Sequence, residues 1–208
     1  MADFKIKSAA GTGNKTLIQG QDQSGSNYAI QVGDAGATTL TNATITAGSG
    51  LVGIKEQDAW RITSALTTSS TNEIVTANWE RDDSVMASQL IGTGMTESSG
   101  VFTFPSTGIW LLIADAFIQS GTTGAYAGWA IQITTDNSSY NPRAESFTNV
   151  EDSGEHSATC CMCFFDVTNV STHKCRIGIA AAASSGVQFA GDSNVNKSGI
   201  IFLRIGDT

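Results

Sequence analysis

The alternation of apolar and polar residues along the chain predicts β-strands almost throughout, with no convincing helical period. The clearest pattern runs from Gly100 to Phe117. There a short apolar segment, 101–104, and a longer one beginning at Ile109 flank the corner Pro105-Ser-Thr-Gly108. Proline fixes one φ angle and glycine adopts turn conformations that β-branched residues avoid, so this corner ends one strand and begins the next. We expect the strands after residue 75 to be arranged around this pair.

Further apolar runs predict strands as far as the C-terminal end. They cover residues 73–81, 128–134, 144–150, 157–167, 175–180, 187–190 and 199–205. With the pair above they make roughly eight or nine strands joined by polar loops, a number typical of a two-sheet Greek-key or jelly-roll sandwich. The last run is almost wholly apolar, which predicts a central position in its sheet with both faces covered.

The first 50 residues have a pattern of their own. Short alternating segments at 3–7, 15–19, 27–32 and 38–46 predict four strands of a β-meander, separated by Gly- and Asn-rich turn clusters. Each segment carries roughly two or three apolar side chains, too few to offset an ordering cost of about 1–2 kcal/mol per residue. We therefore expect the missing burial to come from other chains or from a docking surface.

The predicted domain organisation has three parts. Residues 1–50 form an N-terminal attachment module, 51–71 a linker or boundary that follows the hinge Ala47-Gly-Ser-Gly50, and 72–208 a larger β domain. Trp60 lies near this boundary between acidic and basic neighbours and is predicted to be an exposed contact, because Trp and Arg are common at interface hot spots. The candidate attachment residues are Phe4, Ile6, Leu17, Tyr28, Ile30, Val32, Leu40 and Trp60.

Composition narrows the range of partners. The chain carries 11 Lys and Arg against 19 Asp and Glu, a formal charge of -8. It has no basic run, which argues against nucleic-acid binding and against adhesion to anionic lipid. No stretch approaches the length of an apolar membrane helix, and the first residues lack the pattern of a secretory leader. We expect no nucleic-acid or membrane partner and synthesis in a cytoplasm.

Candidate chemistry centres on the cysteines, which are Cys160, Cys161, Cys163 and Cys175. We expect small buried hydrophobic side chains, with Cys161 and Cys163 on one face of a strand. Zinc with His156 or His173 as a fourth ligand is the alternative, although Cys-Cys-x-Cys lacks the usual ligand spacing. A disulfide from Cys175 to one of the other three also stays open, but a reducing compartment disfavours it.

No catalytic pattern is visible in the sequence. The two histidines fall in polar loops and are expected to be solvated, and no nucleophile elbow accompanies them. Asp82-Asp83 and the group Glu151, Asp152 and Glu155 are candidate calcium ligands, since that ion takes carboxylate oxygens. We expect these acidic loops to be simply solvated, and no cofactor.

The central strand pair resembles the tumour-necrosis-factor-like jelly roll, specifically the complement-type globular head family. The family pattern G-x-F-x-x-P-x-x-G-x-Y-x-F is matched by Gly100, Phe102, Pro105, Gly108, Trp110 and Leu112, with Trp and Leu replacing Tyr and Phe. Ser198-Gly-Ile-Ile-Phe202 is similar to the family's closing strand. The resemblance covers roughly 72–208 and implies a ten-stranded jelly roll in a tight homotrimer. The candidate core or trimer-packing residues are Phe102, Phe104, Trp110, Leu112, Trp129 and Phe202.

The N-terminal part resembles the repeat-like openings of phage fibre and head-decoration proteins. The resemblance rests on Gly13-Asn-Lys-Thr-Leu17, on Gln21-Asp-Gln-Ser-Gly-Ser26 and on Val32-Gly-Asp-Ala-Gly-Ala-Thr-Thr-Leu40. The two resemblances together imply a non-enzymatic, all-β, trimeric bacteriophage virion protein. Its partners would be further copies of itself and the major capsid protein or tail components.

A head-decoration (cement) or short head-fibre role is favoured, because 208 residues leave little length for a shaft once the head domain is built. The alternative is a tail-fibre tip that binds a host receptor or glycan. A third hypothesis is a polysaccharide-active enzyme.

Overall fold

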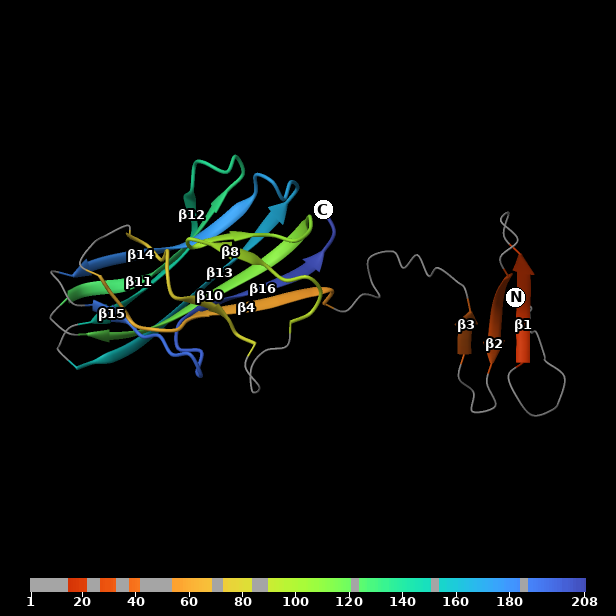
Figure 1. Ribbon diagram of the computed structural model, residues 1–208, viewed down its shortest axis with the longest axis horizontal. Helices are drawn as coiled ribbons and strands as arrows, with labels where there is room; N and C mark the ends of the chain where they lie inside the picture. The colour runs from red at the N-terminus through yellow and green to blue at the C-terminus, as the bar shows by residue number, and fades with distance from the viewer. Residues whose placement is uncertain are drawn as a thin grey trace, which may run out of the picture. The chain divides into compact units, whose positions relative to one another are not determined.

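The structure is a computed structural model of residues 1–208. It describes the strands at 15–21, 27–32 and 38–41 and the residues 54–68, 73–83, 90–120, 124–150, 154–183 and 187–208. The chain forms two compact units, Met1–Leu51 and Val52–Thr208, and each is described by itself (Figure 1).

The N-terminal unit contains a three-stranded antiparallel sheet of β1 (Lys15–Gln21), β2 (Asn27–Val32) and β3 (Thr38–Thr41), in that order. In this register Ile30 of β2 is the Cα partner of both Ile18 and Leu40. Three of the four strands expected here are therefore present. The segment 3–7, with Phe4 and Ile6, lies outside the described residues. Leu17, Tyr28, Ile30, Val32 and Leu40 lie on the three strands.

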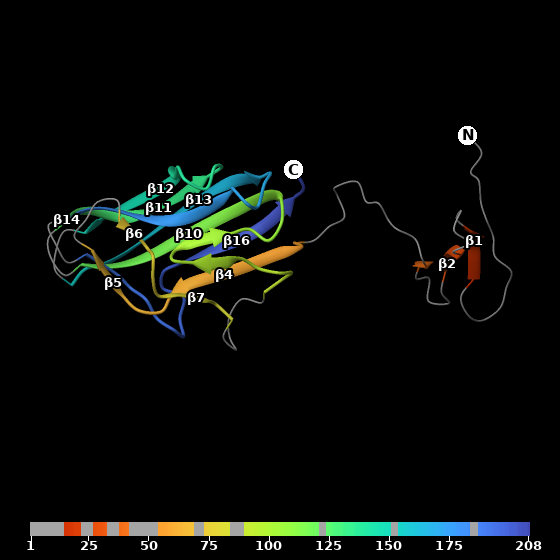
Figure 2. The ribbon, with the colours of Figure 1, turned by 45° about the horizontal axis from the view of Figure 1, so that its top comes forward.

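The C-terminal unit is built from two antiparallel sheets. Its described strands are β4 (Glu56–Ile62), β5 (Leu66–Thr68), β6 (Glu73–Ile74), β7 (Trp79–Arg81), β8 (Thr96–Ser98), β9 (Val101–Thr103), β10 (Gly108–Ser120), β11 (Gly124–Thr134), β12 (Asn141–Val150), β13 (His156–Val167), β14 (Lys174–Ala183), β15 (Val187–Phe189) and β16 (Gly199–Gly206). One sheet has the order β5-β15-β10-β16-β4-β7, and β13 also pairs with β10. The other has the order β12-β11-β14-β9-β8, and β6 also pairs with β14. Figure 2 shows the two layers, with β10, β16 and β4 below β11 and β12.

The predicted corner at 105–108 joins the two sheets. β9 belongs to the six-stranded sheet and β10 to the seven-stranded one, so the corner carries the chain across the sandwich. Gly108 has a φ of 141°, and a Cβ atom there would lie 2.6 Å from the carbonyl oxygen of Gly206. Glycine is therefore required at this position. β10, with 13 residues, then becomes the strand to which β13, β15 and β16 all pair.

The core between the sheets is aromatic. The rings of Phe104 and Trp110 have centroids 5.2 Å apart, those of Phe102 and Phe202 also 5.2 Å, and those of Phe104 and Phe165 5.6 Å. Edge-to-face and tilted ring pairs at such distances are favourable beyond the area they bury. The six candidate core or trimer-packing residues, Phe102, Phe104, Trp110, Leu112, Trp129 and Phe202, are each at most 1% exposed in a single chain. They pack inside the sandwich, so contacts between chains must come from other residues.

The expected linker at 51–71 is wrong. β4 and β5 lie within it, and both belong to the seven-stranded sheet, β4 being paired along its length with β16. The pattern of β4 is broken by charged residues whose partners are distant in sequence. The carboxylate of Asp58, 2% exposed, accepts a hydrogen bond of 3.0 Å from Nε of Arg81 on β7. A buried charge that is paired in this way is tolerated in a strand, but its partner cannot be identified from local sequence.

The prediction that Trp60 is an exposed contact is also wrong. Trp60 is half-buried on β4, and its ring lies edge-on to Phe102 with centroids 5.7 Å apart. The guanidinium of Arg81 covers the ring at 4.9 Å, and the indole N–H donates to Asp58 at 2.9 Å. Trp60 therefore closes the edge of the core instead of offering a contact surface.

Two smaller expectations need correction between residues 73 and 100. The single strand expected at 73–81 is divided into β6 and β7, which lie in different sheets, and Asn78 between them has a φ of 66°. A left-handed residue of this kind turns the chain from one sheet to the other. The polar segment before Gly100, where no strand is predicted, contains the short strand β8.

The closing strand β16 holds the central position that its apolar sequence predicts, between β10 and β4. The prediction that both faces of β16 are covered is wrong for the single chain. Ile200 and Phe202 are fully buried, whereas Ile201 and Leu203 are only half-buried and Ile205 is 52% exposed. One face of the strand is covered by the core, and the other carries apolar side chains at the surface of the single chain.

Candidate assembly surface

The outer face of the seven-stranded sheet carries apolar side chains that do not pack into the core. Along β10, Trp110, Leu112 and Ala114 are buried, while Leu111 and Ile113 between them are only half-buried. Successive residues of a strand point to opposite faces of the sheet. A strand that is apolar at every position therefore presents one apolar row to the core and one to the outside.

The neighbouring strands extend this outer row sideways. Leu111 is the Cα partner of Phe164 on β13 and of Leu203 on β16, and Ile113 is the partner of Met162 and Ile201 on the same two strands. Directly opposed residues on one face of a sheet have neighbouring side chains. We call this set the assembly face; its residues are Leu111, Ile113, Met162, Phe164, Ile201 and Leu203.

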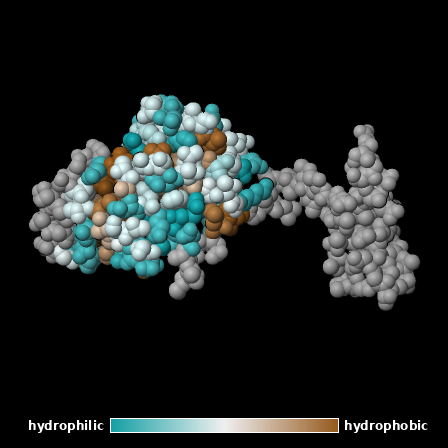
Figure 3. Space-filling model, in the orientation of Figure 1, coloured by the Kyte–Doolittle hydropathy of each residue, from teal (hydrophilic) through white to brown (hydrophobic). Residues whose placement is uncertain are grey.

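The assembly face is exposed where it crosses β13. Phe164 is 63% exposed and Met162 is 61% exposed, and both are among the described residues that show large apolar side chains to solvent. Single exposed apolar residues are normal on a protein surface, but a contiguous group of them marks an interaction site. Figure 3 shows apolar patches between hydrophilic areas on the side of the C-terminal unit turned to the viewer.

The size of the face fits part of a specific interface. The six residues occupy two side-chain positions on each of three strands. With strands about 4.8 Å apart and same-face side chains about 6.8 Å apart, they cover roughly 14 Å by 14 Å, or roughly 200 Å². A specific interface of standard size covers about 800 Å² on each partner. The assembly face therefore accounts for about a quarter of such an interface, and residues around it must supply the rest.

Asp115 follows the apolar rows on β10. It lies between Cys160 of β13 and Gly199 of β16 and borders a hollow of about 390 Å³. The hollow is also lined by Phe117, Ala158, Asn196 and Lys197. Burial raises the pKa of Asp115 to about 6, while a hydrogen bond from its own backbone amide opposes the rise. A half-buried carboxyl group therefore adjoins the apolar rows.

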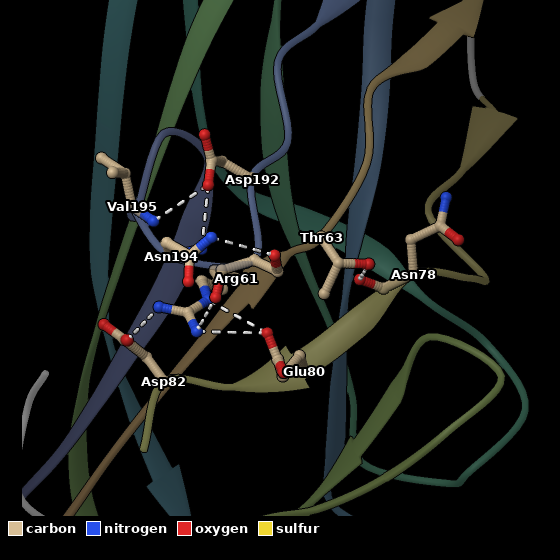
Figure 4. A network of polar contacts seen from close by, with 9 residues as sticks. Arg61, Thr63, Asn78, Glu80, Asp82, Asp192, Asn194 and Val195 are labelled. Atoms are coloured by element: carbon tan, nitrogen blue, oxygen red, sulfur yellow. Dashed lines mark hydrogen bonds and ion pairs between the residues drawn. The ribbon is translucent and has the colours of Figure 1, made fainter. Parts of the chain in front are cut away.

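The loop between β15 and β16 lies beside the hollow. Arg61 of β4 holds this loop in place through hydrogen bonds (Figure 4). Arg61 is 2% exposed and donates hydrogen bonds to Asp82 at 2.5 Å, to Glu80 at 3.2 Å and to the carbonyl oxygen of Ser193. Asp192 accepts hydrogen bonds from the backbone amides of the two residues Asn194 and Val195 at 2.8 and 3.2 Å. These bonds fix the loop whose next residues, 196 and 197, line the hollow at Asp115.

The four cysteines differ in their exposure to solvent. Cys161 and Cys175 are buried, as expected for small hydrophobic side chains, and Cys163 is half-buried on the same face of β13 as Cys161. Burial raises the pKa of Cys161 to about 11 and that of Cys175 well above its usual value. Cys160 is exposed, contrary to the prediction, because it lies on the outer side of β13 beside Asp115. All four thiols are free, so the disulfide alternative is wrong.

The histidines and acidic residues that the sequence offered as metal ligands or catalytic bases lie at different places in the structure. His173 is buried, which corrects the expectation of a solvated loop histidine; its ring stacks on Phe165 at 5.5 Å. His156 is exposed and stacks on Phe117 at 5.3 Å. Asp82 is held by Arg61, and Glu151 and Asp152 lie outside the described residues. Within the described part of the chain, no group of three His, Cys, Asp or Glu side chains is placed to hold a metal ion.

Sequence reasoning missed the assembly face, although its signal was present. Continuous apolar runs at 109–113, 161–165 and 200–203 need burial on both faces of a strand, and this argument was applied only to the closing strand. In the part of the chain that the structure describes, no helix is long and apolar enough to cross a membrane.

Comparison with known proteins supports the fold. No family model matches the sequence, and no curated protein matches it. Among solved structures, Eiger TNF from S. frugiperda matches 75% of this chain and 96% of its own, with a TM-score of 0.56 and 11% identity. Murine APRIL at pH 5.0 matches 72% of this chain and 98% of its own, with a TM-score of 0.50 and 10% identity.

The C-terminal unit is thus an all-β, two-sheet jelly-roll sandwich. More particularly, its fold is that of the TNF-like jelly roll, as the resemblance at Gly100–Leu112 predicted. The phage origin stays a prediction.

Proposed function

We propose that the protein is a non-enzymatic, homotrimeric structural protein of a bacteriophage virion. Its C-terminal jelly roll assembles through the assembly face, and its N-terminal unit attaches the trimer to the particle, as a head-decoration protein or short head fibre. The observation that carries the proposal is the apolar face formed by β10, β13 and β16, with Met162 and Phe164 more than 60% exposed in the single chain.

Further copies of the chain are the occupant that best fits this face. A cyclic trimer is closed by one kind of contact, in which the assembly face of each subunit meets a different patch of its neighbour. The TNF-like fold favours such a trimer, because the resemblance identified at the central strand pair implies that assembly. The face is also nearly free of charge, although the whole chain carries -8, so approach of a second copy meets little local repulsion.

The particle-binding role rests on the N-terminal unit. β1, β2 and β3 form a small sheet, with strands of 7, 6 and 4 residues, in a compact unit of its own. A sheet of three short strands is stable by itself only if it has a hydrophobic face or packs against another element. Together with the likeness of its turns to phage fibre and decoration proteins, this favours attachment to the major capsid protein or to a tail component.

The placement of the ionisable groups supports a role without catalysis. His173 lies between the hydroxyl groups of Thr168 and Thr172 at 3.1 Å each and is enclosed by the turn before β14. His156 stands apart from it at the start of β13. Catalysis by a nucleophile and a base needs the two groups within hydrogen-bond reach at an accessible site. Turnover of a polysaccharide by the purified protein would revive the enzyme hypothesis.

The mass of the full-length protein in solution tests the proposal. Light scattering at micromolar concentration should give three times the chain mass of 21.7 kDa, about 65 kDa. A stable monomer would overturn the assembly role. Imaging of particles with the protein labelled should then place many copies on the head; a few copies at the tail would replace this role by the receptor-binding fibre tip.

A further inference from the structure

Asp115 occupies an unusual place at the edge of the assembly face. Its Cα partners are Cys160 on β13 and Gly199 on β16, and it follows Ile113 on the outward side of β10. Gly199 has no side chain, and the space above it is taken by the neutral amide of Asn196, whose Oδ1 would lie 2.8 Å from a Cβ atom at that position. Aromatic and apolar side chains, Phe117 and Ala158, form much of the remaining wall of the hollow.

The charged groups around Asp115 are engaged elsewhere. Lys197 lines the same hollow, but its Nζ atom forms an ion pair of 3.1 Å with Asp192. On β4, beyond Gly199, Arg61 is bound to Glu80 and Asp82.

Among the described residues, two further titratable neighbours lie on β13. They are the Cys160 thiol and His156, which is the partner of Gln119 four residues further along β10 and stacks on Phe117. Among the described residues, no cation forms an ion pair with the Asp115 carboxylate.

We propose that Asp115 makes assembly pH-sensitive: subunits associate more tightly when its carboxyl group is protonated, because a neighbour covering the hollow removes it from water. This inference rests on the self-association proposed above and names its regulation. A neighbouring copy is a poor source of a countercharge, since the chain has only 11 basic residues against 19 acidic ones. Removal of an unpaired carboxylate from water is unfavourable, so the neutral form of Asp115 is favoured in the covered state.

The direction of the effect follows from linkage. In the single chain, burial already raises the pKa of Asp115 from its usual range to about 6. Covering by a neighbour raises it further, so the assembled state binds the proton more tightly. Assembly is therefore strongest below pH 6 and weakens as the pH rises through 6 and beyond. A further rise of one unit on assembly would make association about sevenfold stronger per subunit at pH 5.0 than at pH 7.5.

The test is sedimentation velocity of the full-length protein between pH 5.0 and 8.0, with wild type compared with D115N. We expect the wild-type dissociation constant to fall by sevenfold or more per subunit toward pH 5.0. D115N, neutral throughout, should assemble about as tightly at pH 8.0 as the wild type does at pH 5.0. D83N, an exposed carboxylate after β7, controls for the net charge, and H156Q controls for the histidine; both should retain the wild-type slope.

The outcomes separate this inference from the proposed function. A monomer at every pH, in wild type and D115N alike, overturns the self-association and the inference with it. A trimer whose stability does not depend on pH overturns only the role of Asp115. If H156Q loses the slope and D115N keeps it, the histidine is the titrating group and the inference is wrong. Circular dichroism of each variant shows whether it has folded, and the wild-type and H156Q profiles decide the question should D115N not fold.

Discussion

Replacement of Met162 by lysine gives a direct test of the assembly face. Met162 is 61% exposed on β13 and is the Cα partner of Ile113 at the centre of the face. Since the side chain is mostly in water in the single chain, we expect M162K to change the free energy of unfolding of that chain by less than about 0.5 kcal/mol. Its effect should fall on association.

The magnitude follows from the exposed fraction. Covering a Met side chain completely contributes about 1.5–3 kcal/mol, so covering the exposed 61% contributes about 1–2 kcal/mol per interface. Lysine loses most of the free energy that covering the methionine side chain contributes. It also places an ammonium group among apolar side chains, which costs several kcal/mol unless the group reaches water at the rim. A total of about 3 kcal/mol corresponds to more than a hundredfold in the affinity of each interface.

Sedimentation velocity from 1 to 100 µM measures the result, and thermal unfolding of dilute samples checks that the single chain is intact. We expect M162K to be monomeric over this range. The matched control is F147K on β12, where Phe147 is 45% exposed and packs on Tyr126 on the outer side of the six-stranded sheet. If M162K stays trimeric while F147K dissociates, the interface lies on the opposite sheet and the reasoning is refuted.

Three further predictions concern stability and reactivity. D58A removes the buried carboxylate that pairs with the half-buried Arg81 at 3.0 Å and also accepts hydrogen bonds from the Met95 amide and the Trp60 indole. It should lower the free energy of unfolding by about 3–5 kcal/mol in urea; a loss below about 1 kcal/mol would contradict the pairing. G128A would drive a methyl group into a backbone carbonyl oxygen of β12 and should cost about 1–3 kcal/mol, whereas G206A, with open space around it, should be nearly neutral; equal effects would count against this packing. In dissociated M162K, maleimide should label the exposed Cys160 before the other three thiols, as mass spectrometry would show. Cys160 should react more slowly in the wild-type trimer; equal rates in the two proteins would place this thiol outside the interface.

Local chemistry predicted much of the fold. The corner at Pro105–Gly108 and the apolar strand after it follow from the backbone limits of two residue types and from a run of five apolar side chains. The closing strand showed its central position by the same apolar character. β4 was missed because its charged residues hide the strand pattern, and Asp58 finds Arg81 only across 23 positions of sequence. No local pattern carries that information.

The chain's sequence thus determined by itself that residues 109–113 and 200–203 form strands with apolar side chains on both faces, since period-two alternation is absent there. It did not determine which face is inner. Tertiary structure decided that Trp110 and Leu112 enter the core, while Leu111, Ile113 and Asp115 remain outside. The physical reason is that one row of a strand's side chains becomes buried only when a second sheet covers it. The register with the neighbouring strands then determines which row this is.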